Sequence, residues 1–301
     1  MNLEAAAAYA ERHALEAMLA VRGGEIAFER YAPGFDAETP HALYSGTKSF
    51  WGVAAVAAQE DGLLSLDETV GATFPAWNAG RRARVTLRHL LTLTSGIGFG
   101  GLGNAVPAYA KALDVDLTDE PGATFTYGGI PLQVFGAVFA AKLAARMQTP
   151  HAYLRERILA PAGCTVASWR ALKDGTHPLP TGAFLTARAW AAYGAFAARE
   201  GRAAGGRIVS EASFAACLEP TEANPRYGLG WWLSPLPARP RIFYASGSGG
   251  QALYVFPDDD LAIVKFSKNA SGYAHPAFLR RLFEEDASPS ASKGRRNRVH
   301  V

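Results

Sequence analysis

A serine and a lysine three positions apart are the residues of this chain that could do covalent chemistry together. They are Ser45 and Lys48, within the stretch Tyr44-Ser45-Gly46-Thr47-Lys48-Ser49-Phe50-Trp51. On a helix, side chains at this spacing lie on one face, so the lysine amine can reach the serine hydroxyl. A serine hydroxyl is a weak nucleophile until a base takes its proton, and burial disfavours the ammonium form of a lysine. The pair therefore predicts nucleophilic catalysis at the start of a buried helix.

The spacing alone is weak evidence, because the chain contains it twice. Ser290 and Lys293 have the same separation in a polar tail that offers nothing to hold either side chain in place. The segment after Ser45 differs, since it continues as an apolar helix of mostly small residues with aromatic neighbours that exclude water from the lysine. This context favours the first pair.

The composition predicts a globular protein with one large domain or two closely packed lobes. Of 301 residues, 49% are hydrophobic, and 30 basic against 27 acidic residues leave a formal net charge of +3. The only basic cluster lies within 293–298, so nucleic-acid binding is not indicated. Cys164 and Cys217 are too few for a disulfide framework, and the seven histidines lack paired ligand spacing. We therefore predict no metal site.

A glycine-rich loop contains a formal G-x-G-x-x-G at Gly98, Gly100 and Gly103. A dinucleotide-binding fingerprint needs a strand before these glycines and a helix after them. Here a helical pattern precedes the glycines, and Asn104-Ala105-Val106-Pro107 follows them. We therefore predict no cofactor.

The sequence shows neither a secretory signal at its N-terminus nor an apolar run long enough to span a membrane. The N-terminus lacks the basic and apolar regions of a secretory signal, and the longest apolar runs, such as 130–141, are shorter than the roughly 18 residues that span a bilayer. Unless a leader has been removed, these features predict a cytoplasmic protein that does not enter the membrane. The sequence does not indicate an oligomeric state.

Strand patterns occur near both ends of the chain, and helical patterns occupy the middle. Strands are expected over 25–31, 227–233, 241–244, 251–256 and 261–266. Helices are expected over 3–20, 45–60, 87–91, 107–113, 131–146, 150–158, 186–200, 210–217 and 275–285. Residues 287–301 are rich in Ser, Pro and Arg and are expected to be a disordered tail.

A series of motifs resembles the class C β-lactamase-like serine hydrolases, a superfamily that includes penicillin-binding DD-peptidases, family VIII esterases and 6-aminohexanoate-dimer hydrolases. The most specific motif is Arg88-His89-Leu90-Leu91-Thr92-Leu93-Thr94-Ser95-Gly96. The others, in family order, are Phe28-Glu29-Arg30-Tyr31, Tyr44-Ser45-Gly46-Thr47-Lys48, Pro121-Gly122-Ala123-Thr124-Phe125-Thr126-Tyr127, Leu185-Thr186-Ala187-Arg188 and Tyr227-Gly228-Leu229-Gly230-Trp231. The resemblance covers roughly residues 25 to 268.

The resemblance implies three catalytic residues. Ser45 matches the family's nucleophile, Lys48 its paired base or electrostatic helper, and Tyr127 its catalytic tyrosine. A phenol has a pKa near 10, and we expect the adjacent Lys48 cation to lower the pKa of Tyr127 so that it can carry protons.

The third family motif, K-T-G or H-x-G on a strand at the edge of the site, falls at Ser246-Gly247-Ser248-Gly249-Gly250-Gln251. A strand edge there would donate a backbone N–H to the substrate carbonyl and complete an oxyanion hole with the N–H of Ser45. Gly247, Ser248, Gly249 and Gly250 are therefore the expected oxyanion and substrate strand. The alignment frame between Gly247 and Ser248 stays open, as does the alternative of a plain glycine hairpin.

Two departures from the family concern the substrate. Gly129 stands where the family commonly has an amide-binding Asn, and the third motif lacks its cation or imidazole. Substrates of β-lactamases and DD-peptidases offer an amide and a carboxylate, so both losses argue against a potent enzyme of either kind. We expect Gly129 and the aromatic residues Trp51, Phe99, Trp231 and Trp232 to line the substrate pocket.

The expected fold follows from the strands at both ends together with the resemblance. It is α+β, an antiparallel sheet flanked by helices and built from residues 1–64 and 186–286, with a mostly helical lobe inserted at 65–185. The expected function is hydrolysis of a small-molecule carboxylic ester or small amide through an acyl-enzyme on Ser45. The alternatives are a non-catalytic module that binds a ligand or partner in the same cleft, and a weak β-lactamase or DD-peptidase.

Overall fold

The computed structural model describes residues 1–99 and 106–284. Its α-helices are α1 (Leu3–Glu11), α2 (Ser49–Glu60), α3 (Leu87–Leu91), α4 (Tyr109–Ala112), α5 (Ile130–Leu143), α6 (Pro150–Leu154), α7 (Ala187–Ala198), α8 (Glu211–Ala216) and α9 (His275–Leu282). Its strands are β1 (Leu15–Arg22), β2 (Glu25–Tyr31), β3 (His41–Ala42), β4 (Ser168–Trp169), β5 (Ala183–Leu185), β6 (Arg202–Ala203), β7 (Gly206–Arg207), β8 (Trp232–Leu233), β9 (Phe243–Gly247), β10 (Gln251–Phe256) and β11 (Leu261–Ser267).

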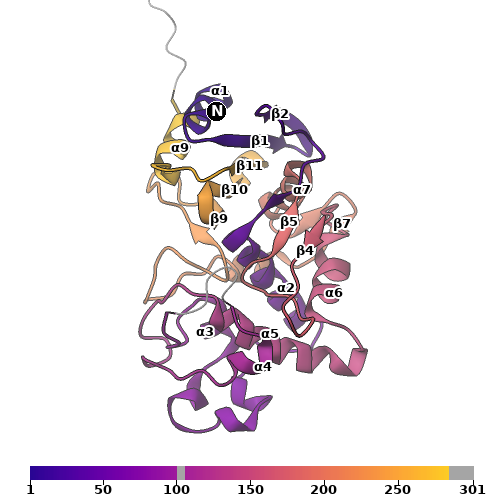
Figure 1. Cartoon of the computed structure of the whole chain (residues 1–301), viewed down its shortest axis with the longest axis vertical. Coiled ribbons are helices and arrows are strands. Elements are labelled where there is room, and N and C mark those ends of the chain that lie inside the picture. Colours follow the sequence, from indigo (N-terminus) through magenta and orange to yellow (C-terminus); the bar gives the residue numbers. More distant parts are fainter. Residues whose placement is uncertain (100–105, 285–301) are drawn as a thin grey trace, which may run out of the picture.

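A six-stranded antiparallel sheet joins the two ends of the chain. Its order is β2-β1-β11-β10-β9-β8, so the N-terminal hairpin pairs with β11 and the C-terminal strands complete the sheet (Figure 1). Residues between β3 and β8 supply most of the helices, including α3, α4 and α5, which lie away from this sheet (Figure 1). The predicted α+β class, with an antiparallel sheet and flanking helices, is confirmed.

Helices cover both faces of the sheet. On one face, α1 and α9 bury a cluster that includes Tyr9, Phe278 and the sheet residue Tyr254. On the other face, α7 stacks Trp190 on Phe266 of β11 with ring centres 5.2 Å apart. The large core on this second face also contains α2, which is why its small residues are buried.

The predicted helix over 3–20 is wrong in its second half. Helix α1 ends at Glu11, Ala14 takes a left-handed backbone conformation with φ 53°, and the chain continues as the central strand β1. Because both faces of β1 are covered, Leu15 to Val21 is almost continuously apolar and lacks the alternation that would mark a strand.

The predicted strand over 227–233 is reduced to Trp232 and Leu233, and the next strand begins at Phe243 rather than Arg241. Gly230 turns the chain with φ 85°, and a β-carbon there would lie 2.4 Å from the carbonyl oxygen of Lys48. This loop therefore crosses close to the start of α2, which a regular strand would not allow.

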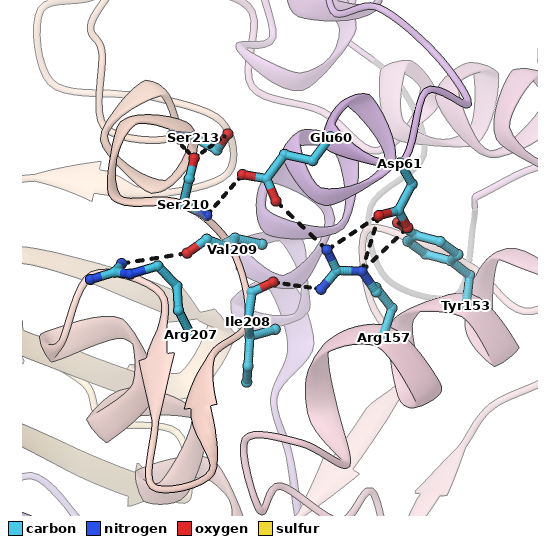
Figure 2. A network of polar contacts seen from close by, with 9 residues as sticks. All are labelled: Glu60, Asp61, Tyr153, Arg157, Arg207, Ile208, Val209, Ser210 and Ser213. Atoms are coloured by element: carbon cyan, nitrogen blue, oxygen red, sulfur yellow. Dashed lines mark hydrogen bonds and ion pairs between the residues drawn. The ribbon is translucent and has the colours of Figure 1, made fainter.

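A polar network fixes the far end of α2 (Figure 2). Asp61, just after the helix, accepts from Arg157 at 3.2 Å and from Tyr153 at 2.7 Å. Arg157 also donates to the carbonyl of Ile208, and Glu60 accepts from the backbone N–H of Ser210 at 2.8 Å. Three segments far apart in sequence thus meet at the end of the helix that begins beside Ser45.

Within the described residues, no single helix has the length and apolar character needed to cross a membrane. The segments Ile130–Arg146 and Pro150–Leu159 meet that test only when taken together, and they are bent by 79°. The predicted tail and two of the three glycines of the formal dinucleotide motif, Gly100 and Gly103, lie outside the described residues.

Candidate active site

Ser45 and Lys48 lie together in a short 3-10 helix that leads into α2. This segment, η1, spans Tyr44–Lys48. Because side chains three apart eclipse each other in a 3-10 helix, the Lys48 Nζ lies 3.0 Å from the Ser45 Oγ. The same Nζ donates to the carbonyl of Pro180 at 3.4 Å. The lysine is therefore held within proton-transfer distance of the serine.

Burial favours the neutral amine form of Lys48. Its side chain is 1% exposed, and burial lowers the pKa of Lys48 to about 7, with no carboxylate of the described chain paired to it. At neutral pH a substantial fraction of Lys48 is consequently a free amine, whose lone pair can take the Ser45 proton.

Tyr127 faces the same pair. The Lys48 Nζ lies 4.7 Å from the centre of the Tyr127 ring, and that ring stacks on Trp232 at 5.6 Å. Burial raises the pKa of Tyr127, while a hydrogen bond with Ser45 acts in the opposite direction. The expectation that Lys48 lowers the pKa of this phenol is therefore wrong. Burial has the largest effect on the pKa of Tyr127, and it also makes the charged form of Lys48 less populated. Tyr127 keeps its proton at neutral pH and can donate it.

Ser45 and Tyr127 border a cavity of about 690 Å³, while Lys48 lies behind Ser45 and is not among the lining residues. Ten residues line it: Tyr44, Ser45, Tyr127, Thr181, Trp232, Tyr244, Ser246, Gly247, Ser248 and His275. None of these side chains carries a full charge at neutral pH, because burial, reinforced by Lys265, lowers the pKa of His275 to about 4. The cavity is thus aromatic and polar but uncharged.

The edge of β9 packs directly against the segment that carries Ser45. A β-carbon at Gly247 would lie 2.1 Å from the carbonyl oxygen of Leu43, two residues before Ser45. Only glycine allows this approach. The strand end therefore carries Gly247 and Ser248 into the cavity that Ser45 lines, while Gly249 and Gly250 form the turn beyond it.

The segment before β5 closes another side of the cavity through Thr181. Trp51 of α2 donates to the carbonyl of Leu179 at 2.6 Å, and the buried Gln133 of α5 accepts from the Leu179 N–H at 2.9 Å. Together with the contact between Lys48 and Pro180, these bonds fix residues 179–181. No motif in the sequence indicated this segment.

Some predicted pocket residues lie elsewhere. Trp231 is fully buried, whereas its neighbour Trp232 lines the cavity. Trp232 is the register partner of Tyr244, so both side chains lie on the same face of the sheet. Successive residues of an extended chain point to opposite faces, so Trp231 and Trp232 cannot both face the cavity. Trp51 is likewise buried in the core.

Gly129 and Phe99 are not among the lining residues either. Gly129 is the residue immediately before α5 and is buried, while Phe99 is 77% exposed. Gly129 was predicted from its family position two residues after Tyr127, and Phe99 as one of several aromatic residues. Neither argument specifies which way a residue faces.

Sequence reasoning missed Tyr44, Thr181, Tyr244, Ser246 and His275. Tyr244 and Ser246 alternate along β9 and follow Trp232 across the ladder, so a correct strand register would have identified them. His275 reaches the cavity from the start of α9, where its Nε2 lies 3.0 Å from the Ser246 Oγ. No local pattern marks that long-range contact.

Tyr44 holds a strained conformation directly before Ser45. Its φ of 47° is left-handed, which a bulky residue rarely adopts, and its side chain is 45% exposed. The conformation turns the chain from β3 into η1 and places the phenol at the cavity entrance.

The described residues contain no group of three or more His, Cys, Asp or Glu side chains arranged to hold a metal ion.

Comparison with known families and proteins identifies the family and the fold. The Beta-lactamase family model matches residues 6–283. Monacolin J acid methylbutanoyltransferase from Aspergillus terreus is 32% identical over a stretch that covers 44% of this chain and 38% of that protein. The alignment thus spans well under half the length of that relative.

Solved structures share the fold over nearly the whole chain. The putative 6-aminohexanoate-dimer hydrolase from Bacillus anthracis superposes with a TM-score of 0.76 at 19% identity, covering 91% of this chain and 79% of that one. EstCE1, a hydrolase with promiscuous acyltransferase activity, superposes with a TM-score of 0.71 at 16% identity, covering 93% of this chain and 96% of that one. At these identities the likeness establishes the fold.

Proposed function

Because the chain belongs to the Beta-lactamase family and is an enzyme of the serine hydrolase type, we propose that it cleaves uncharged carboxylic esters or small amides through an acyl-enzyme on Ser45. The observation that carries the proposal is the contact of 3.0 Å between the Ser45 Oγ and the Nζ of a lysine whose pKa burial lowers to about 7.

In the first step, Ser45 Oγ attacks the substrate carbonyl carbon while its proton passes to the neutral Lys48 amine. The backbone N–H groups of Ser45 and Ser248 donate to the oxyanion that forms. When the bond to the leaving group breaks, Tyr127 gives its proton to the departing oxygen or nitrogen and is reprotonated from Lys48. The products are the acylated Ser45 and a free alcohol or amine.

In the second step, a water molecule attacks the acyl carbon. Its proton passes through Tyr127 to Lys48, and the bond between the acyl carbon and Ser45 Oγ breaks as the serine recovers a proton. The free acid leaves and the resting state is restored. Both steps use the same two proton carriers, and the Lys48 Nζ lies 3.0 Å from the Ser45 Oγ and 4.7 Å from the centre of the Tyr127 ring.

The preference for an uncharged substrate is supported by the cavity wall. Its aromatic residues Tyr127, Trp232 and Tyr244 provide apolar contact area, and none of its ten residues offers a full positive charge to a carboxylate. Transferring a carboxylate into such a site without a partner is unfavourable. We therefore infer that β-lactams and peptides with a free carboxylate are poor substrates.

A second candidate function is transfer of the acyl group to an alcohol instead of water. The resemblance to a methylbutanoyltransferase and to a hydrolase with acyltransferase activity favours it. The chemistry differs only in the group that attacks the acyl-enzyme, so both candidates require Ser45.

The proposal is tested by turnover of p-nitrophenyl acetate, p-nitroacetanilide and nitrocefin by the native protein and by Ser45→Ala. The native protein is expected to release p-nitrophenol fastest, and the variant is expected to lose that activity. Equal turnover in the two proteins would overturn the proposal, and reversible ligand binding without any turnover would favour the non-catalytic module instead.

A further inference from the structure

A second hydroxyl and an imidazole lie together in the wall of the cavity. The Nε2 of His275 is 3.0 Å from the Oγ of Ser246, and both residues line the space that Ser45 and Tyr127 border. Ser246 is half-buried on β9, and His275 is the first residue of α9, followed by Pro276. The proposed acyl transfer uses neither residue.

Two phenols, the buried one of Tyr254 and the half-buried one of Tyr273, continue this contact away from the cavity. The Nδ1 of His275 lies 2.6 Å from the hydroxyl of Tyr254, which lies 2.6 Å from the hydroxyl of Tyr273. Four groups therefore share three hydrogen bonds in a row. Tyr254 is fully buried, so its hydroxyl has only these two neighbours to satisfy it in the described chain.

The hydrogen bonds of this row can run in two directions, depending on which nitrogen of His275 carries the proton. Each direction leaves the Ser246 hydroxyl with a different hydrogen-bonding capacity toward the cavity. If Tyr254 donates to Nδ1, the Nε2–H donates to Ser246, whose own hydrogen is free to donate into the cavity. If Nδ1–H donates to Tyr254, Ser246 donates to Nε2 and can only accept from the cavity. The pair can thus match either a carbonyl or a hydroxyl.

The same contacts argue against a second nucleophile at Ser246. The Nδ1 partner is a phenol and not a carboxylate, so nothing compensates an imidazolium. The groups facing His275 are Tyr244 of β9, Tyr254 of β10 and Tyr273, and Lys265 of β11 lies 3.8 Å from the Tyr273 ring centre. Burial, reinforced by Lys265, lowers the pKa of His275, and no carboxylate is among the groups that face its ring, so the imidazole stays neutral.

The position of the pair identifies the part of the substrate it meets. An aromatic wall runs from Tyr127, which stacks on Trp232, through Tyr244 to His275, whose ring centre is 4.8 Å from that of Tyr244. In the proposed reaction Tyr127 protonates the leaving group. The alcohol part of an ester therefore extends along this wall, toward Ser246 and His275.

We propose that Ser246 and His275 form a subsite for an uncharged hydroxyl or carbonyl oxygen on the alcohol part of the substrate ester. The inference rests on the proposed acyl transfer at Ser45. Ser246 makes the contact, His275 also borders the cavity, and Tyr254 is a positioning residue that holds the imidazole. By microscopic reversibility, an alcohol that accepts the acyl group occupies the same subsite.

The test uses three aryl acetates that share an acyl group and differ in one meta substituent of the leaving phenol. These are m-tolyl acetate, m-(hydroxymethyl)phenyl acetate and m-carboxyphenyl acetate, whose substituents alter the reactivity of the phenol little. The native enzyme is expected to give the highest kcat/KM with the hydroxymethyl ester and the lowest with the carboxylate ester. A kcat/KM for the carboxylate ester that equals or exceeds that for the hydroxymethyl ester would overturn the proposal.

The variant Ser246→Ala is expected to lower the hydroxymethyl-to-methyl ratio of kcat/KM by about tenfold, the loss of one hydrogen bond. Ser246→Thr keeps the hydroxyl and is expected to retain the ratio, and Tyr254→Phe is expected to reduce it partly. A ratio unchanged in Ser246→Ala would overturn the subsite, as would fluorophosphonate labelling of Ser246 in a Ser45→Ala background.

Failure of the subsite is distinguishable from failure of the reaction at Ser45. If only the subsite is wrong, Ser45→Ala still abolishes turnover of all three esters, and the ratio is insensitive to Ser246. If the reaction itself is wrong, Ser45→Ala hydrolyses the esters like the native protein. Because each ratio is measured within one protein, partial unfolding of a variant does not alter it.

Discussion

A β-carbon at Gly247 would lie 2.1 Å from the carbonyl oxygen of Leu43, so the end of β9 and the segment that carries Ser45 are in backbone contact. This contact is what allows Ser248 to share a cavity with Ser45. It ties the proposed oxyanion hole to the sheet through β9 and to α2 through η1.

Replacing Gly247 with alanine should therefore separate the two segments and misplace an oxyanion donor. We expect Gly247→Ala to lower kcat for p-nitrophenyl acetate by about a hundredfold or more. Gly205→Ala is the matched control, because a β-carbon at Gly205 meets nothing within 4 Å. Similar losses in both variants would contradict the assignment of the strand edge.

The pH dependence of the reaction should follow Lys48. Burial lowers the pKa of Lys48 to about 7, and the neutral amine is the active form, so kcat/KM should fall about tenfold per unit as pH drops below that value and level off above it. Lys48→Arg, which stays charged, should be inactive at every accessible pH.

Lys265 is the control for this profile, since burial also lowers its pKa to about 7. Its Nζ donates to the carbonyl of Gly250 at 3.0 Å, outside the proton path. The acidic limb should persist in Lys265→Met, even if the rate is reduced by a looser turn. If the acidic limb of the kcat/KM profile disappears in Lys265→Met, Lys48 is not the base.

Tyr127 should matter through its hydroxyl. Tyr127→Phe keeps the stacking on Trp232 but removes the proton donor, and we expect kcat to fall by roughly a hundredfold with the ring still in place. Tyr227→Phe is the matched control. The ring of Tyr227 packs edge-on against that of Tyr127, with ring centres 6.2 Å apart, but Tyr227 does not line the cavity. Steady-state kinetics of the two variants decides between a proton carrier and a packing residue.

The polar network at the end of α2 should contribute to stability and not to chemistry. Arg157→Met leaves Asp61 half-buried without its cation, and we expect the free energy of unfolding to fall by about 2 kcal/mol. Arg155→Met is the control, since that residue pairs with Glu156 on the exposed surface and should leave the denaturation midpoint unchanged. Urea titrations followed by circular dichroism measure both.

Features set by local spacing could be predicted from the sequence. Ser45 and Lys48 are neighbours on one short helix, and the cap of α3 at Thr86 follows from its residue type. Strand β1 could not be predicted, because a strand covered on both faces has the composition of a buried helix. The choice between Trp231 and Trp232 needed the register of β8 against β9, which a two-residue strand does not reveal.

The cavity wall was harder still, because it is built by contacts between distant segments. His275 meets Ser246 across 29 positions, and Pro180 meets Lys48 across 132. The tuning of Lys48 and Tyr127 also depends on burial and not on residue type, which is why the expected direction for the Tyr127 pKa was wrong.

The most direct test of the central claim is the mass of the acyl-enzyme. The native protein is mixed with excess p-nitrophenyl acetate, quenched in acid within the first turnovers, and examined by intact and peptide mass spectrometry. We predict one acetyl group, located on Ser45 and missing in Ser45→Ala. An acetyl group on another residue, or turnover of the ester by Ser45→Ala at the native rate, would contradict the account.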